Sequence, residues 1–185
     1  MGLNYLIRKA EAVAELYEKM SDESKEYSSK NNIKCLSGCG RCCDNPDIFA
    51  SPLEMLPLAI ELYFKNSNKL EALEDIIEKC RKEDVCIYYS IGKHKNEGSC
   101  GAYNNRPVVC RLFGWSLVST KRGKEISICS LLKDEKKLSM EGAPDIVSWN
   151  SRVSNIDPGL SGIMPLNKAF AAALEKVLTA ARYSA

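Results

Sequence analysis

A stretch of nine residues with four cysteines constrains this chain more than any other feature. It reads Cys35-Leu-Ser-Gly-Cys39-Gly-Arg-Cys42-Cys43. Cysteine thiolates are the preferred protein ligands of zinc, Cu(I) and iron–sulfur clusters. The two glycines inside the stretch allow tight backbone turns, so that several sulfurs can converge. The stretch therefore predicts one half of a metal site, in which the adjacent Cys42 and Cys43 either serve different centres or differ in that only one is a ligand.

Later cysteines are expected to supply the other half of the site. They are Cys86, Cys100, Cys110 and Cys129. The ninth cysteine, Cys80, falls on the apolar face of a predicted helix, where a buried free cysteine packs as a small apolar side chain. An odd number of cysteines also fits a disulfide framework poorly, although disulfides stay the alternative for an exported protein.

The charge balance gives no sign of a nucleic-acid or membrane partner. The 185 residues include 26 basic and 24 acidic side chains, interspersed along the chain, for a net charge of +2. No stretch is apolar enough to span a bilayer, and the start lacks a secretory apolar core. We expect a cytoplasmic protein, and in a reducing compartment clustered cysteines are typically metal ligands.

Apolar spacing predicts four main helices. The first covers Leu3 to Ser28, the third runs from about Lys69 to Lys82, and the last runs from about Pro165 to Tyr183. The second begins with the N-cap signature Ser51-Pro-Leu-Glu54, and Pro57 either kinks it or starts another helix. Its expected inner face is Leu53, Leu56, Ile60 and Phe64, and that of the third helix is Leu70, Leu73, Ile76, Ile77 and Cys80.

The middle of the chain, from Asp84 to Ser130, loses helical periodicity. Alternating residues predict a hairpin that pairs 116–119 with 125–128. A short helix over 131–140 and a mostly irregular segment over 141–163 are expected to follow. The predicted fold class is therefore a helix-rich α+β single domain over residues 1–185. Its loop-dominated, cysteine-rich core spans about 33–130 and carries one small β-hairpin between N- and C-terminal helices.

The order of the cysteines resembles a known family. The pattern Cys35-x3-Cys39-x2-Cys42-Cys43 is followed by Cys86, by Cys100-x5-Arg106-Pro107-x2-Cys110-Arg111 and by Cys129. It resembles the YkgJ-like cysteine-cluster proteins, described as zinc- or iron-chelating domains, over about residues 33 to 130. The resemblance implies that these eight cysteines bind metal and leaves the metal open. Some relatives are flagellin lysine methylases or resemble them, which implies redox or methyl-transfer chemistry.

A second pattern overlaps the first. The spacing Cys35-x3-Cys39-x2-Cys42 is also that of radical S-adenosylmethionine enzymes, in which three cysteines leave one iron open. Those enzymes look like partial or full α/β barrels. No alternating series of strands and helices follows the motif here, and the additional cysteines indicate a fully ligated centre.

Other residues near the cysteines allow a functional and a structural interpretation. Arg106 and Arg111 either donate hydrogen bonds to ligand sulfurs, as groups around a cofactor do, or pair with an acid such as Asp44. We interpret Tyr103 and Trp115 as packing residues. Asp44 and Asp47 either assist chemistry or bind a labile metal, or, as we expect, form a turn. His94 is expected to be a solvated loop residue.

The sequence thus predicts a metal-binding protein whose favoured cofactor is an iron–sulfur cluster, for example [4Fe–4S], in redox, electron transfer or cluster handling. Eight dispersed thiolates exceed the four that a single zinc ion uses. The alternatives are a structural zinc module and a metal-dependent enzyme such as a protein methyltransferase. Metal ions are the one expected partner. No catalytic residue, substrate or protein partner can be assigned from the sequence.

Overall fold

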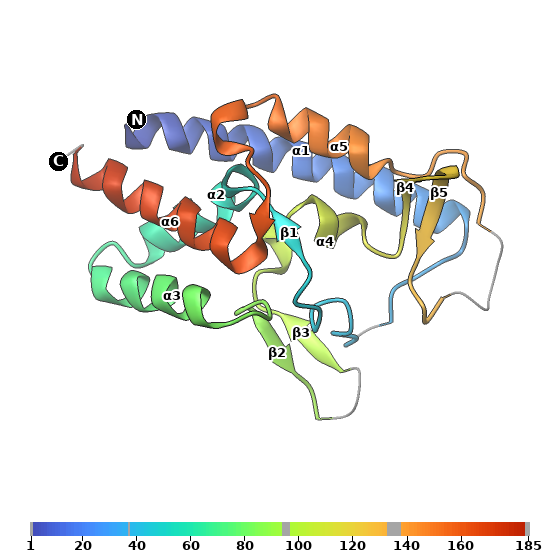
Figure 1. Cartoon of the computed structure of the whole chain (residues 1–185), viewed down its shortest axis with the longest axis horizontal. Coiled ribbons are helices and arrows are strands. Elements are labelled where there is room, and N and C mark those ends of the chain that lie inside the picture. Colours follow the sequence, from blue (N-terminus) through green and yellow to red (C-terminus); the bar gives the residue numbers. More distant parts are fainter. Residues whose placement is uncertain (1, 37, 94–96, 133–137, 184–185) are drawn as a thin grey trace.

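The computed structural model describes residues 2–36, 38–93, 97–132 and 138–183. Over these residues the chain is a helix-rich α+β fold with six α-helices and three two-stranded antiparallel sheets (Figure 1). The fold class predicted from the sequence is confirmed. The helices are α1 (Leu3–Lys30), α2 (Pro52–Lys65), α3 (Leu70–Lys82), α4 (Val108–Leu112), α5 (Ile146–Ser154) and α6 (Leu166–Arg182).

Four predicted helices, α1, α2, α3 and α6, form most of the core. Helix α2 packs against both α1 and α6, and α3 covers α6 from the other side. Helix α1 buries one residue every three or four positions along its whole length, which is the periodicity that predicted it. Its buried residues are Leu6, Ala10, Val13, Tyr17, Met20, Ser24 and Tyr27. Helix α6 is the most buried, because its apolar face packs between α2 and α3.

Helix α2 starts as predicted. The Ser51 hydroxyl accepts a hydrogen bond from the Glu54 amide at 3.3 Å, and the Glu54 carboxylate accepts one from the Ser51 amide at 2.7 Å. Pro57 lies within one continuous helix, where it removes a single backbone hydrogen bond near the start. The prediction of the inner faces is wrong at two positions. Phe64, near the end of α2, is 57% exposed, and Leu70, at the start of α3, is 42% exposed.

The segment expected to be mostly irregular, 141–163, contains α5, and this prediction is wrong. Asp145 caps the helix by accepting hydrogen bonds from the Val147 and Ser148 amides. Trp149 and Val153, four residues apart, are buried on its inner face. The helix expected over 131–140 falls largely on residues outside those described, and the described ends of that segment are not helical.

The strands form three separate small sheets. Strands β4 (Trp115–Thr120) and β5 (Gly123–Ile128) are the predicted hairpin, with Trp115 opposite Ile128 and Thr120 opposite Gly123. Strands β2 (Tyr89–Ile91) and β3 (Gly98–Cys100) form a second hairpin, in which Tyr89 pairs with Cys100. Strands β1 (Phe49–Ala50) and β6 (Met164–Pro165) join the segments that precede α2 and α6.

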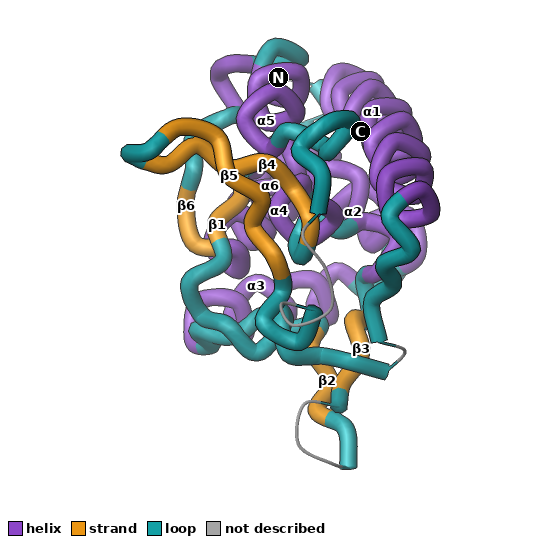
Figure 2. Tube along the Cα trace, turned by 90° about the vertical axis from the view of Figure 1, so that its right-hand side faces the viewer, coloured by secondary structure: helices purple, strands orange, loops and turns teal. Residues whose placement is uncertain are grey.

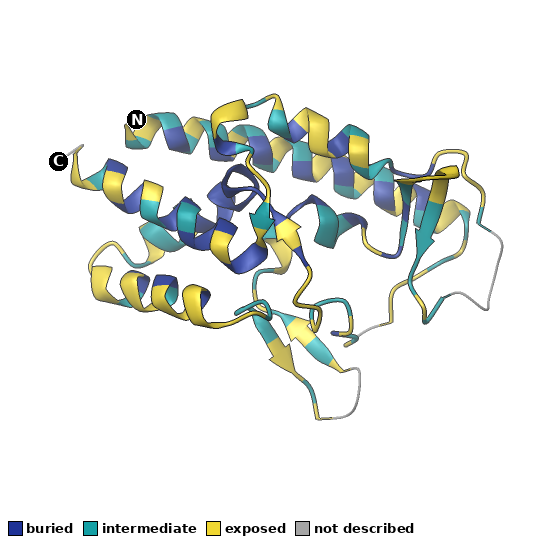
Figure 3. Ribbon diagram, in the orientation of Figure 1, coloured by how far each residue is buried: buried dark blue, intermediate teal, exposed yellow. Residues whose placement is uncertain are grey.

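The two hairpins of the cysteine-rich part of the chain lie outside the helical core. In Figure 1 the hairpins β2–β3 and β4–β5 project below and to the right of the helices, and Figure 2 shows them on separate sides of the molecule. Burial is concentrated in the helices, whereas the β2–β3 hairpin is largely exposed (Figure 3). Among the described residues, no helix has the length and apolar character needed to cross a membrane.

Candidate metal centre

The eight cysteines predicted as ligands line two adjoining cavities. The larger, of about 1290 Å³, lies between α1, the cysteine stretch and α4. The smaller, of about 170 Å³, lies against α2 and α6. Cysteines lining the larger cavity are Cys35, Cys39, Cys42, Cys43, Cys100, Cys110 and Cys129, and those lining the smaller are Cys42, Cys43, Cys86, Cys100 and Cys110. Cys80 lines neither cavity and is 1% exposed in the core, as predicted.

The first cysteine stretch is an irregular segment held against the β2–β3 hairpin. Cys39 forms an isolated antiparallel bridge with Glu97, and the Gly98 amide donates to the Gly38 carbonyl at 2.9 Å. Gly38 has φ +72°, a left-handed conformation that favours glycine. These contacts fix the stretch beside Cys100, which lies two residues beyond Gly98 in strand β3.

Gly40 allows the closest approach between the stretch and the hairpin. A β-carbon at this position would lie 2.7 Å from the Cα of Gly98 and 2.5 Å from the ring of Tyr89. Real β-carbons do not approach other atoms so closely, so only glycine fits without a shift of the backbone. The glycine between Cys39 and Cys42 therefore has a packing role that a tight turn alone does not explain.

Helix α4 carries Cys110 and starts at a buried carboxylate. The Val108 amide donates to Glu54 Oε1 at 3.0 Å, and the Tyr17 hydroxyl donates to the Glu54 carbonyl at 2.9 Å. Glu54 is only 4% exposed, and burial raises the pKa of its carboxyl against the opposing hydrogen bonds from Ser51 and Val108. Pro107 precedes the helix, and Arg106 before it is extended, as the sequence predicted.

Cys42, Cys43 and Cys100 interact most closely. The sulfurs of Cys42 and Cys43 lie 4.0 Å apart. The Cys43 thiol hydrogen-bonds to Cys42 and to Cys100, and this interaction lowers the pKa of each of these two to about 6. The same interactions, together with burial, raise the pKa of Cys43. Two of the three side chains are therefore poised as thiolates, the form that binds metal.

At Cys110, Cys86 and Cys35, burial has the largest effect on the pKa of the thiol. It raises the pKa of Cys110 to about 12, with further contributions from Cys86 and other thiols, and the charge of Arg106 opposes it. Burial also raises the pKa of Cys86 and Cys35. A buried thiol gains a strong incentive to lose its proton only when a cation arrives, so metal binding here should release protons.

Arg106 lies between the cysteines and donates to backbone oxygens. Its Nη1 donates to the Cys110 carbonyl and its Nε to the Tyr103 carbonyl, both at 3.2 Å. The guanidinium carbon lies 3.7 Å from the centroid of the Tyr103 ring. The accepting atoms are thus carbonyls, while the arginine charge acts on the thiols through space and favours the thiolate at Cys42 and Cys100, after the larger effect of Cys43.

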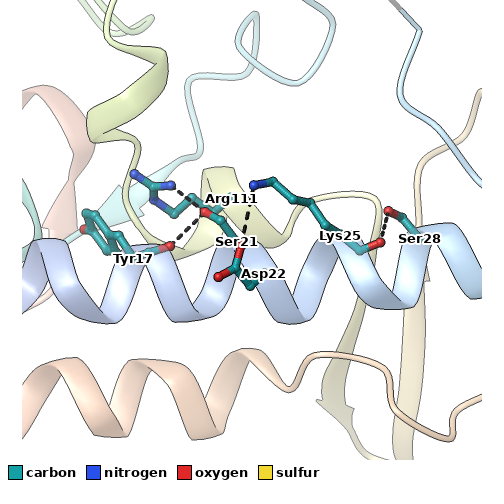
Figure 4. A network of polar contacts seen from close by, with 6 residues as sticks. All are labelled: Tyr17, Ser21, Asp22, Lys25, Ser28 and Arg111. Carbon is teal, nitrogen blue, oxygen red and sulfur yellow. Dashed lines mark hydrogen bonds and ion pairs between the residues drawn. The ribbon is translucent and has the colours of Figure 1, made fainter.

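Arg111 ties α4 to α1. Its Nε donates to the Arg106 carbonyl at 2.7 Å, and its Nη1 donates to the Ser21 hydroxyl at 3.0 Å. Its guanidinium carbon lies 4.2 Å from the centroid of the Tyr17 ring. Figure 4 shows this arginine above α1, with Ser21 donating in turn to the Tyr17 carbonyl at 2.7 Å. Arg111 therefore holds the Arg106 loop against α1 and also lines the larger cavity.

Other residues considered in the sequence lie around the site. Trp115 donates from its indole nitrogen to the Ser24 hydroxyl at 3.0 Å, and Tyr103, 61% exposed, packs against Arg106. The Asp47 amide donates to the Asn45 side chain at 2.9 Å in a local turn, and Asp44 is exposed. His94 lies outside the described residues.

Sequence reasoning missed two residues that position the site. Glu54 was predicted as a capping residue of α2, but nothing local indicated that its second oxygen would hold α4. Tyr89 packs against both Gly40 and Gly98, and no signal separated it from the neighbouring Tyr88. Glycine two residues before a predicted ligand, as in Gly98-Ser-Cys100, is the one available sign of close backbone approach.

A family model matches residues 34–138, which is more than half of the chain. The model is CxxCxxCC, with the description "Putative zinc- or iron-chelating domain". The chain belongs to this family. The match includes all eight predicted ligands and the Arg-Pro-x-x-Cys-Arg element, and it agrees with the resemblance seen in the sequence. No curated protein and no solved structure matches the chain.

The donor set fits the metals that the CxxCxxCC family description names. All nine cysteines are free thiols, and the eight around the cavities are soft ligands suited to zinc and to iron–sulfur clusters. Within the part of the chain that the structure describes, no three Cys, His, Asp or Glu side chains converge on one ion position. The thiols instead surround two cavities. A metal bound in a cavity would draw the surrounding thiols toward it.

Proposed function

We propose that this protein binds an iron–sulfur cluster, or clusters, through the thiolates of Cys35, Cys39, Cys42, Cys43, Cys86, Cys100, Cys110 and Cys129. Its role would be redox, electron transfer or cluster handling in the cytoplasm. One observation carries the proposal: the fold gathers these eight free thiols around two adjoining cavities and leaves the ninth, Cys80, in the core. Cys80 has the same side chain as the other eight cysteines, but it packs in the core as an apolar residue does.

The number and surroundings of the thiols favour clusters over one zinc ion. A structural zinc ion takes four ligands, whereas eight thiols are available. Each iron–sulfur cluster presents several irons to ligands that approach from different directions, which suits thiols contributed by loops, strands and a helix. When bound, the cluster would supply one-electron chemistry. The chain's own part is to offer thiolates, with Arg106 offsetting their negative charge.

A second candidate is a metal-dependent enzyme, such as a protein methyltransferase related to the flagellin lysine methylases. The cavity of about 1290 Å³ favours it, because that volume beside Cys35 and Cys39 exceeds what a metal centre needs. A substrate segment could lie along α1 in this space. Tyr17 and Ser21, two hydroxyls that line this cavity, donate to backbone carbonyls and not to a base, so the binding role is the better-supported one.

Purification without air, followed by metal, sulfide and absorption measurements, tests the proposal. We expect brown protein that contains iron and acid-labile sulfide and whose visible absorption bleaches on reduction. Stoichiometric zinc with no iron or sulfide in the anaerobic sample would favour the structural zinc module. Protein that binds neither metal after reconstitution would contradict the metal-binding function altogether.

A further inference from the structure

The cysteines are distributed unequally between the two cavities. This distribution indicates which cysteines bind metal together. Cys35, Cys39 and Cys129 line only the larger cavity, whereas Cys86 lines only the smaller. The other four line both, so they lie at the boundary. A single centre would require Cys86 and the group around Cys35 to reach one position from different cavities.

The electrostatic neighbours of Cys35 and of Cys110 fall into the same two groups, while Cys42 itself is acted on by Cys43 and Cys100. After burial, the thiols that act on Cys35 are Cys39, Cys42 and Cys129. Those that act on Cys110 are Cys86, Cys42 and Cys100. Cys42 is the one thiol that belongs to both lists. Cys35 and Cys86 are thus the extremes of two groups that meet at Cys42.

Cys43 belongs to the group around the smaller cavity. It hydrogen-bonds to Cys100, and Cys100 in turn acts on Cys86. With Cys110 these residues make four thiols without Cys42. The group around Cys35 has three thiols of its own and needs Cys42 as its fourth. Adjacent residues in the chain then serve different centres, which avoids the strain of bringing neighbouring side chains to one ion.

We propose that the eight cysteines form two separate four-thiolate centres, an outer one held by Cys35, Cys39, Cys42 and Cys129 and an inner one held by Cys43, Cys86, Cys100 and Cys110. The inference rests on the proposed metal-binding function and adds the number of centres and their ligands. The proposal specifies which four thiolates bind each centre. Each centre can take either a zinc ion or an iron–sulfur cluster.

The surroundings of the two centres differ, which assigns them different roles. Ile48, Met55, Leu58 and Phe170 of the core line the smaller cavity, so the inner centre lies against the apolar core and is the less accessible of the two. The outer centre lies beside the large cavity, and Cys35 is exposed. A closed site is typical of structural metals, while an accessible one exchanges ligands. The outer centre is therefore the one that a redox partner or substrate would reach.

Stepwise metal removal from the intact, metal-loaded wild-type protein tests the division. The protein is treated without air with increasing chelator, metal is counted by native mass spectrometry, and freed thiols are alkylated with iodoacetamide and mapped in peptides. We expect a plateau at the inner centre's metal content alone, at which Cys35, Cys39, Cys42 and Cys129 are alkylated and the inner four are protected. Release of all metal in one step, or labelling of Cys43 together with Cys42 at the plateau, would overturn the division.

Matched variants provide the second measurement. Cys35→Ser should lose the outer metal and keep the inner one, and Cys80→Ser should keep both. Loss of all metal from a folded Cys35→Ser protein would contradict two centres. Wild-type protein that binds no metal at all would instead contradict the proposed function, so the two failures can be told apart.

Discussion

Gly40 of the cysteine stretch and Gly98 of strand β3 pack backbone against backbone, with the ring of Tyr89 against both. A β-carbon built on Gly98 would lie 3.1 Å from the Cα of Gly40, and one built on Gly40 would lie 2.7 Å from the Cα of Gly98. The contact joins the two halves of the cysteine pattern, because Gly40 lies between Cys39 and Cys42 and Gly98 lies just before Cys100.

The Gly40→Ala variant should separate the cysteine stretch from the β2–β3 hairpin. The added methyl group meets backbone, which cannot rotate away, so we expect a loss of about 1–3 kcal/mol in the free energy of unfolding. We also expect faster alkylation of Cys39 in the metal-free protein. Chemical denaturation and timed alkylation measure the two effects. The control is Gly162→Ala, since a β-carbon there has no neighbour within 4 Å. Equal behaviour of the two variants would contradict the packing role.

Metal removal should loosen the middle of the chain and spare the helical core. The hairpins β2–β3 and β4–β5 share no sheet, whereas α1, α2, α3 and α6 pack into one apolar core. Metal binding therefore contributes folding free energy mainly to residues near the cysteines. Hydrogen exchange of metal-free and metal-loaded protein should show lost protection around β2–β3 and α4, with α6 unchanged. Equal exchange around β2–β3 and α4 in the metal-free and metal-loaded protein would contradict this account.

The helices could be predicted because their signals are local. Seven residues of α1 repeat at three- and four-residue intervals, and Ser51 with Glu54 marks the start of α2. Helix α5 was missed because glycine, proline and serine flank it, although Asp145 is a good cap and Trp149 and Val153 are apolar. The Gly, Pro, Ser and Asn residues of the longer segment 141–163 hide the pattern of these nine residues.

The arrangement of the site could not be predicted, because it depends on contacts between distant segments. Cysteine spacing identified the candidate ligands, but the second oxygen of Glu54 holds an amide 54 residues away. The β2–β3 hairpin contains Ser90 and Ser99, and neither of its three-residue strands shows a clear alternation. Pairing of Cys39 with Glu97 likewise leaves no trace in either local sequence.

Replacing single cysteines should separate ligands from core residues. Cys80→Ser should bind as much metal as wild type and lose about 1–3 kcal/mol of stability, because it buries a hydroxyl in the apolar face of α3. Cys110→Ser should lose metal, since its thiol lines both cavities. Metal analysis and thermal unfolding of both variants provide the check. Cys80→Ala serves as the control for lost packing. Metal loss in Cys80→Ser, with Cys110→Ser fully loaded, would reverse the assignment.

Glu54→Gln should weaken the junction between α2 and α4. The wild-type carboxylate accepts from the Ser51 amide, the Ser51 hydroxyl and the Val108 amide, at 2.7, 2.9 and 3.0 Å. An amide side chain has one acceptor oxygen, so its NH₂ group must face at least one of these donors. A buried donor without its acceptor costs about 1–3 kcal/mol. Metal affinity should fall as well, because the Val108 hydrogen bond fixes the start of the helix that carries Cys110.

The pH dependence of this variant should differ from that of the wild type in a defined direction. Burial raises the folded-state pKa of Glu54 above its ordinary value of 4.5, so the folded protein keeps this proton at pH values where the unfolded chain has lost it. The stabilisation from the retained proton is complete below pH 4.5 and is lost as the pH rises through the folded-state pKa. Glutamine cannot titrate, so the advantage of the wild type over Glu54→Gln should be greater at acid pH than above the folded-state pKa. Urea denaturation across this range measures it, with the exposed Glu71→Gln as control. A constant difference between wild type and Glu54→Gln at every pH would show that the carboxyl titrates alike in both states.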